Sequence, residues 1–197
     1  LDVRDGNEGS SGGPNGIASP NYKGIPYYQK KLNEFVQTFA RAFNEGYVDT
    51  DDIKGYSATD TFGTGHADGY GYGSSAADNM IRFFTMKGKD GKPLSSEDFV
   101  GTVTDTTDPD YNEDIYNLYS SITAKNFSVS FDIENDYNLI ATAGVAEEAG
   151  NIDVLNELLG FRRNTDMFAE GGPEDFMKSL VATLGVDAEQ AANYESN

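Results

Sequence analysis

The chain of 197 residues contains no cysteine, no tryptophan and a single histidine, His66. Without cysteine it can form neither a disulfide framework nor a thiolate metal site. This fits either a reducing cell interior or an exported protein stabilised by packing alone. A catalytic triad or a histidine metal site would have to be built around His66 alone. Because His66 lies in a glycine-rich stretch, we expect it to be exposed and to have no chemical role.

Basic residues are also scarce. The 14 Lys and Arg residues stand against 33 Asp and Glu residues, which gives a formal net charge of −19. No basic stripe could offset phosphates, so nucleic acid and anionic membrane surfaces are poor candidates as partners. No apolar run approaches a membrane span, and we expect no signal peptide. The chain starts at Leu1 rather than Met and stops at Asn197 within a helical pattern, so we expect a fragment of a longer protein.

The chain is organised around a predicted helix over residues 25–45. Pro26 suits its first turn, and Asn44-Glu45-Gly46 offers a stop. Its apolar residues follow the spacing of one helix face: Tyr28, Leu32, Phe35, Val36, Phe39 and Phe43. Such a face needs a partner, and residues 151–163 and 173–195 have similar patterns. We therefore predict an α+β fold with a discontinuous, bundle-like helical core of residues 25–46 plus 149–197, in which the last helix runs through Gly185.

The remaining segments have a different composition. Residues 1–24 are rich in Gly, Ser, Pro and Asn and are predicted to be an extended N-terminal loop segment. Residues 47–148 are predicted to form an inserted β-rich domain. Within it, residues 80–86, 99–104 and 127–133 are predicted strands, while 115–122 fits either a helix or a strand.

Three kinds of site could be hidden in this sequence: a nucleotide-binding loop, a calcium loop and a catalytic carboxylate pair. The glycines from Gly63 to Gly73 lack the GxGxxG spacing and a following Lys-Ser/Thr, so we expect an ordinary irregular loop. Asp108, Asp110 and Asn112 match the start of a calcium loop, but Glu113 stands where that loop needs Gly and Tyr119 where it needs Glu. No carboxylate pair is marked by an apolar setting that would raise a pKa. We therefore predict no catalytic, cofactor-binding or metal-binding residues.

Several segments resemble, in order, the flagellar hook-associated protein FlgK family. Residues 1–5 (LDVRD), 25–28 (IPYY) and the helix ending at Asn44 are similar to the passage between two core helices of that family. Residues 126–143 resemble its NxxVxxxIxxDxxxIAA run, and residues 150–158 resemble its GDN-leucine helix. Residues 173–186 (PEDFMKSLVATLGV) are similar to its late helix. Residues 6–24 look like an insertion, and residues 47–125 match the family poorly.

The resemblance implies a structural, non-catalytic protein at the junction of the flagellar hook and filament. Such a protein would be extracellular, exported unfolded through the flagellar channel without a signal peptide. Its partners would be the hook protein, neighbouring copies of itself and the next hook-associated or filament protein. The terminal segments through which such proteins polymerise are absent from this chain, so the isolated fragment is expected to be a monomer.

Two other functions compete with this interpretation. A secreted or cell-surface binding module could use the acidic, glycine-rich middle segment as its recognition surface. A carboxylate-based hydrolase could use two of the many acidic residues, and would need a deep pocket flanked by two carboxyls of raised pKa.

Overall fold

A long central helix, α1 (Ile25–Glu45), organises the computed structural model, which describes residues 24–46, 64–75, 80–105, 107–108, 110–148 and 150–195. Pro26 lies in its first turn, as predicted. The helix ends at Gly46, whose φ of 85° favours glycine and whose N–H donates to the Ala42 carbonyl. The predicted bounds of this helix are confirmed.

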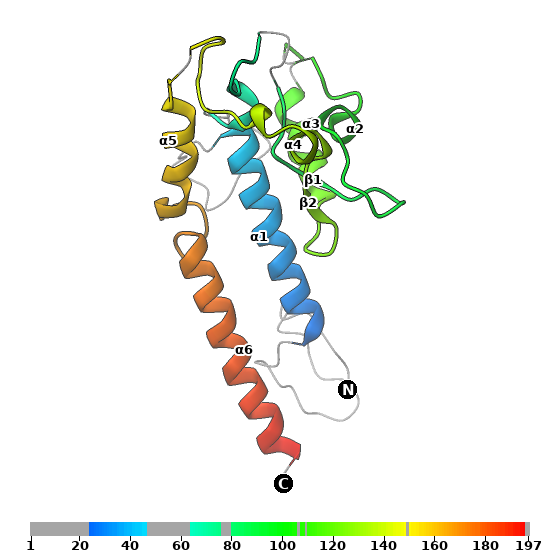
Figure 1. Ribbon diagram of the computed structural model, residues 1–197. Helices are drawn as coiled ribbons and strands as arrows, with labels where there is room; N and C mark the ends of the chain where they lie inside the picture. The colour runs from blue at the N-terminus through cyan, green and yellow to red at the C-terminus, as the bar shows by residue number, and fades with distance from the viewer. Residues whose placement is uncertain are drawn as a thin grey trace.

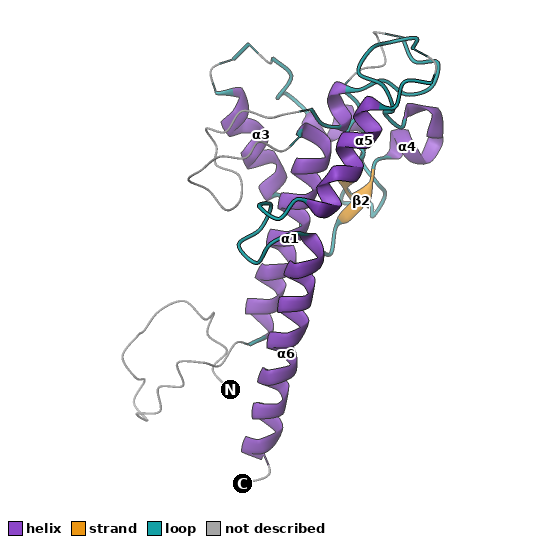
Figure 2. Cartoon of the chain, turned by 90° about the vertical axis from the view of Figure 1, so that its left-hand side faces the viewer, coloured by secondary structure: helices purple, strands orange, loops and turns teal. Residues whose placement is uncertain are grey.

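The second long helix, α6 (Pro173–Glu195), lies beside α1 and runs in the opposite direction (Figure 1). Aromatic rings join them: the centroid of Phe35 on α1 lies 5.4 Å from that of Phe176 on α6, and 5.3 Å from that of Phe168, which precedes α6. Further along, the Tyr28 hydroxyl donates to the Asp187 carboxylate. The helix α6 continues through Gly185, as predicted, and its last turns project beyond the start of α1 (Figures 1 and 2).

The chain enters α6 through α5 (Asp153–Gly160) and the 3₁₀ turn η4 (Phe161–Arg163). Side chains from these elements, from α1, from α6 and from the loops at Ala141 and residues 167–168 form a first core cluster. Its buried members are Ala42, Ala141, Val154, Leu158, Phe161, Met167, Phe168 and Phe176.

The other side of α1 carries a small head made from residues 80–135. In it, β1 (Phe84–Met86) pairs antiparallel with β2 (Phe127–Val129), with Phe84 opposite Val129. Three helices surround this ribbon: α2 (Ser96–Val100), α3 (Tyr111–Ser120) and α4 (Phe131–Asn135). A second core cluster lies here, formed by Val36, Ala40, Phe99, Val100, Ile115, Tyr119 and Ile122. Because α1 contributes to both clusters, it connects the head to the α5–α6 arm.

There are two further 3₁₀ turns. The turn η1 (His66–Asp68) packs against α1, and η3 (Tyr137–Leu139) follows α4 and contacts it. In the described part of the chain the structure is mixed, with six α-helices and one two-stranded antiparallel sheet, which agrees with α+β in the broad sense. None of the helices in these residue ranges has the length and apolar content needed to cross a bilayer.

Two of the predicted strands are wrong in whole or in part because serine caps start helices there. The expected strand over 99–104 is wrong: the Ser95 hydroxyl accepts a hydrogen bond of 3.0 Å from the Asp98 N–H and starts α2. Similarly, Ser130 caps α4 by accepting from the Ile133 N–H, so the strand predicted over 127–133 ends at Val129. The strand predicted over 80–86 forms only over 84–86.

The prediction that residues 47–148 are β-rich is also wrong for the described part of that segment. It holds two strands of 3 residues each against helices of 5, 10 and 5 residues, and the ambiguous stretch near 115–122 belongs mainly to α3. The division into a helical core and an inserted domain stays a prediction. Residues 1–23 of the predicted N-terminal segment, and residues 47–63, lie outside the described residues.

Candidate functional site

A buried ion pair joins the end of α1 to the segment before β1. The Arg82 Nε atom lies 2.9 Å from Glu45 Oε1, and its Nη2 atom lies 3.3 Å from Oε2, a fork-on-fork arrangement. The Tyr119 hydroxyl donates to the same Glu45 Oε1 atom over 2.6 Å. These side chains are 3%, 6% and 1% exposed for Arg82, Glu45 and Tyr119. Two buried charges therefore neutralise each other inside the protein.

Asn44 adds a second connection from the same turn of α1. Its Oδ1 atom accepts from the Phe83 and Phe84 N–H groups, at 2.9 and 3.0 Å. Its Nδ2 atom donates to the Phe84 carbonyl at 2.7 Å and to the Tyr119 hydroxyl at 2.8 Å. The Asn44 side chain thus makes hydrogen bonds to the backbone of β1 like those that a neighbouring strand would make, and it holds the start of β1 in place. Asn44 was expected only as a helix stop.

The electrostatics of this cluster fit a structural connection. Burial disfavours the charged guanidinium of Arg82, but the Glu45 carboxylate outweighs it, and the pKa of Arg82 lies above its ordinary value. Burial, followed by the nearby Glu45 charge, raises the pKa of the Tyr119 hydroxyl well above 10. The Arg82 guanidinium therefore stays charged and the Tyr119 hydroxyl stays protonated. The cluster can orient and hold the chain segments that it joins.

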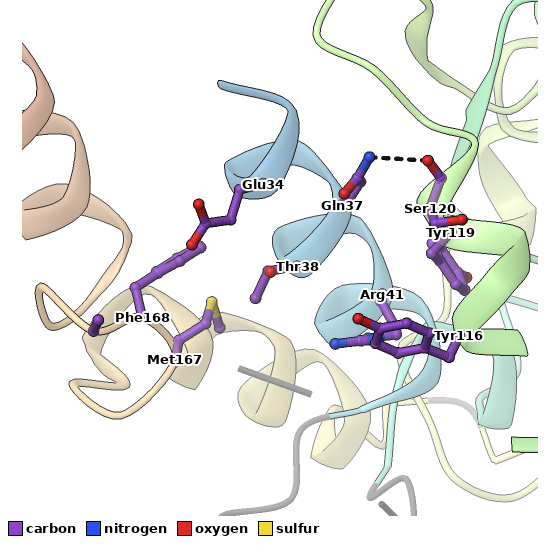
Figure 3. Close-up of a pocket in the computed structure, with 10 residues that line it drawn as sticks. Glu34, Gln37, Thr38, Arg41, Tyr116, Tyr119, Ser120, Met167 and Phe168 are labelled. Carbon is purple, nitrogen blue, oxygen red and sulfur yellow. Dashed lines mark hydrogen bonds between the residues drawn. The ribbon is translucent and has the colours of Figure 1, made fainter. Parts of the chain in front are cut away.

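The surface hollow nearest this cluster lies between α1, α3 and residues 167–169 and encloses about 200 Å³ (Figure 3). One wall is apolar and comes from Met167 and Phe168. At the opposite wall the Arg41 guanidinium lies 4.6 Å from the centre of the Tyr116 ring. Gln37 closes one side by donating to the Ser120 carbonyl at 3.0 Å and to the Ile122 carbonyl at 2.7 Å. The amide hydrogens of Gln37 are thereby committed to holding α3.

The chemistry of this hollow is that of a small binding surface. Its described ionisable side chains are Glu34, Arg41, Tyr116 and Tyr119. Glu34 forms an ion pair with Lys31 at 3.0 Å, and the Tyr119 hydroxyl donates to Glu45. Catalysis by nucleophilic attack would need a nucleophile hydrogen-bonded to a base, and these described lining residues supply no such pair.

The acidic stretch near Asp108 forms turns and a helix start. The Asp105 carboxylate accepts from the Thr107 N–H, and the Asp108 carboxylate accepts from the Asp110 N–H, each at 2.9 Å. Tyr119, at the position where a calcium loop needs glutamate, is buried in the core. In the described residues no three His, Cys, Asp or Glu side chains gather as a metal site would require.

The glycine-rich stretch, described from residue 64, packs closely and uses its amides internally. The Gly65 N–H donates to the Asp68 carboxylate at 2.9 Å, and the Tyr70 N–H donates to the Ala143 carbonyl at 2.8 Å. At Gly71 an added Cβ would lie 1.8 Å from the Asn138 carbonyl oxygen, so only glycine fits. Over residues 64–75 the stretch holds the 3₁₀ turn η1 and a β-bridge between Tyr70 and Ala143, and its glycines permit close contact between backbones.

His66 is buried, so its predicted exposure is wrong. It is 1% exposed, and its ring packs on Phe43 and Phe83 at centroid distances of 6.2 and 5.4 Å. The prediction weighed the flanking glycines as signs of an open loop. They instead bring η1 against the end of α1, since an added Cβ at Gly65 would lie 2.3 Å from the Asn44 carbonyl oxygen.

One carboxyl has a raised pKa among the described acids. Burial raises the pKa of Asp68, against the opposing hydrogen bond from Gly65. Its charged neighbours are Glu45 and Arg82, which already pair with each other. Neither Asp68 nor Glu45 lines the hollow beside α3. Among the described residues, the one carboxyl with a raised pKa therefore lies apart from this hollow.

Sequence reasoning missed the cluster of Glu45, Arg82 and Tyr119. These residues lie on three separate elements, and Arg82 stands 37 positions after Glu45. The one sequence signal for the burial of Arg82 is its position within the strand-like run that begins at Met80. In comparisons with known proteins, no protein-family model, curated protein or solved structure matches the chain.

Proposed function

We propose that this chain is the core part of a structural protein of the bacterial flagellum, acting without catalysis at the junction of hook and filament. The support from sequence is the ordered set of segments that resemble the FlgK family, at residues 1–5, 25–44, 126–143, 150–158 and 173–186. The protein would be exported through the flagellar channel and would work outside the cell. Within it, residues 25–46 and 149–197 form a discontinuous helical core into which residues 47–148 are inserted.

The observation that carries this proposal is a second, uncovered apolar stripe on α6. Phe176, Leu180, Thr183 and Asp187 form the inner stripe, which is at least partly buried on the side of α1. A parallel set, here called the outer stripe, follows the same four-and-three spacing on exposed positions. It consists of Met177, Val181, Leu184, Ala188 and Ala191.

The outer stripe has the character of a helix-packing seam. Val181 is 63% exposed and Leu184 is 49% exposed, so about half or more of each side chain is in water. Covering such a side chain completely is worth roughly 1.5–3 kcal/mol. Apolar residues repeated at four-and-three spacing suit knobs-into-holes packing against another helix. A structural protein that assembles through helices needs a surface of this kind.

Charge indicates which helix would cover the outer stripe. The helix α6 carries Glu174, Asp175, Asp187, Glu189 and Glu195 against a single cation, Lys178. A second α6 would bring like charges together, whereas a helix with basic flanking residues would complement them. We assign the outer stripe to a polymerising terminal helix of the parent protein. The hook protein, neighbouring copies and the next hook-associated or filament protein are its proposed partners at the level of the assembly.

Deletion of the gene in the source bacterium tests this function. The proposal predicts cells that build hooks but release or fail to attach their filaments, so that flagellin accumulates in the medium. Electron microscopy of the cells and blotting of the medium measure both effects, and restoring the gene should reverse them. Normal filaments on the deletion strain would refute the junction role and leave the cell-surface binding module as the better interpretation.

A further inference from the structure

His66 joins three chain segments through its two ring nitrogens. Its Nδ1 atom lies 2.7 Å from the Ile81 carbonyl oxygen, just before β1. Its Nε2 atom accepts the Ala141 N–H over 2.9 Å. The ring lies on Phe43 of α1, so the imidazole connects the glycine-rich stretch, the head and the 140–143 segment at the end of the central helix.

These partners fix the protonation state of the ring. A carbonyl can only accept a hydrogen bond and an amide N–H can only donate one. The Nδ1 atom therefore carries the proton, and Nε2 presents its lone pair to Ala141. Adding a proton at Nε2 would place two N–H donors against each other in a buried site. The Ala141 amide would then lose its hydrogen bond to His66 and the contact would open.

The 140–143 segment in turn holds α5. The Thr142 and Ala143 N–H groups donate to the Tyr70 carbonyl, and the Leu155 N–H of α5 donates to the Thr142 carbonyl. An added Cβ at Gly69 would lie within 3.0 Å of both the Ala141 and the Val154 side chains, so the Gly69 backbone packs closely against the side chains of both segments. Loosening Ala141 would therefore weaken the attachment of α5 to the end of α1.

We propose that His66 is an acid-sensitive clasp, whose protonation at Nε2 releases the 140–143 segment and loosens α5 while the α1–α6 pair stays folded. The clasp is independent of the flagellar assignment. It responds to acid alone and needs no bound ligand.

The charged surroundings of His66 allow this response. Burial lowers its pKa from 6.5 to about 4, against the hydrogen bond to Ile81. The elements that pack around the ring carry Asp68 on η1, Glu45 at the end of α1 and Arg82 before β1, and the last two form an ion pair. Residues 140–143 (IATA) bring no charge, and Asp153 of α5 is fully exposed.

The direction of the pH effect follows from proton binding. Between pH 6.5 and about 4 the opened state, with an ordinary imidazole, binds a proton that the closed state excludes. The open population should therefore rise about tenfold for each pH unit lost in this window. The raised pKa of Asp68 acts in the opposite direction, because the closed state takes up that proton first as pH falls.

Nuclear magnetic resonance on the whole chain tests the clasp, and His66 needs no assignment by mutation because it is the single histidine. From pH 6.5 to 4.5, the exchange protection factors of the Ala141 and Leu155 amides should fall by at least tenfold. The protection factor of the Ala40 amide, inside α1, should change less than twofold. An imidazole that titrates near 6.5 with Ala141 still protected would overturn the proposal, as would equal loss of protection at Ala141 and Ala40.

Two variants separate the imidazole from its neighbours. His66→Gln can donate to Ile81 and accept from Ala141 but does not titrate, so the protection of Ala141 should become independent of pH. Asp68→Asn removes the group that opposes the response, so its loss of Ala141 protection with acid should be at least as large as in the wild type. If His66→Gln folds poorly, the wild-type comparison of Ala141 with Ala40 still decides. A pH response that survives in a folded His66→Gln protein contradicts the clasp.

Discussion

The Glu45 carboxylate and the Arg82 guanidinium meet inside the protein, where the last turn of α1 reaches the start of the head. Their closest atoms are 2.9 Å apart, and neither side chain is more than 6% exposed. Replacing one partner leaves the other charged and buried. We therefore expect Arg82→Met or Glu45→Gln to lower the free energy of unfolding by about 3–5 kcal/mol.

The double variant is the control for this pair. Because Arg82→Met together with Glu45→Gln removes both charges, its loss should be clearly smaller than the sum of the single losses. Urea unfolding of the four proteins measures the coupling. Strict additivity, or a single loss below about 1 kcal/mol, would show that the pair contributes little.

Neighbouring residues on α6 provide a matched test of the packing between α1 and α6. Phe176 is 1% exposed and packs on Phe35 and Phe168, so Phe176→Ala should cost about 3–5 kcal/mol. Met177, on the outer stripe, is 36% exposed, and Met177→Ala should cost less than about 1 kcal/mol. Thermal or urea unfolding distinguishes them. Similar losses at the two positions would contradict the observed orientation of α6.

Gly185 lies inside α6 with open space around it. An added Cβ there meets no atom within 4 Å. Alanine is favoured over glycine in a helix interior, so Gly185→Ala should stabilise the protein by up to about 1 kcal/mol. Gly71→Ala, where the Cβ would overlap the Asn138 carbonyl, is the contrasting substitution and should destabilise it. A clear loss of stability in Gly185→Ala would mean that α6 breaks at that residue.

The helices were predictable where a regular apolar face coincides with terminal signals. Pro26 and Gly46 mark the ends of α1, and Pro173 marks the start of α6. The prediction of a strand over 99–104 was wrong. It rested on the β-branched residues of that stretch, whereas the Ser95 cap starts a helix there. A serine followed by acidic residues is a recognisable helix start, so the sequence did contain this signal.

The buried cluster could not have been predicted from local pattern. Glu45 and Arg82 look like ordinary surface charges in sequence, and only the packing of the head on α1 brings them together. The burial of His66 could not be predicted for a related reason. Its glycine neighbours are equally compatible with an open loop and with close contact between backbones, and the choice depends on Asn44 and Ala141, 22 and 75 positions away.

The isolated chain is expected to stay monomeric despite the outer stripe. Copies with a net charge of −19 repel each other, most strongly at low salt, and α6 itself is acidic. Sedimentation velocity at roughly tens of micromolar protein and about 0.1 M salt measures this, at a Debye length near 10 Å. A stable dimer or ring under these conditions would argue that the outer stripe pairs with another copy of itself.

Complementation of the deletion strain tests the central claim most directly. In one variant of the parent protein, Val181→Ser and Leu184→Ser together remove the apolar centre of the outer stripe. In the control variant, Val186→Ser replaces a valine that is 54% exposed on the opposite side of α6. Both proteins should fold with stabilities within about 1 kcal/mol of the wild type, because the altered side chains are exposed. We predict that the Val186→Ser gene restores attached filaments and swimming, and that the double variant is exported but leaves hooks bare. Equal restoration of filaments by both genes would contradict the assignment of the outer stripe to flagellar assembly.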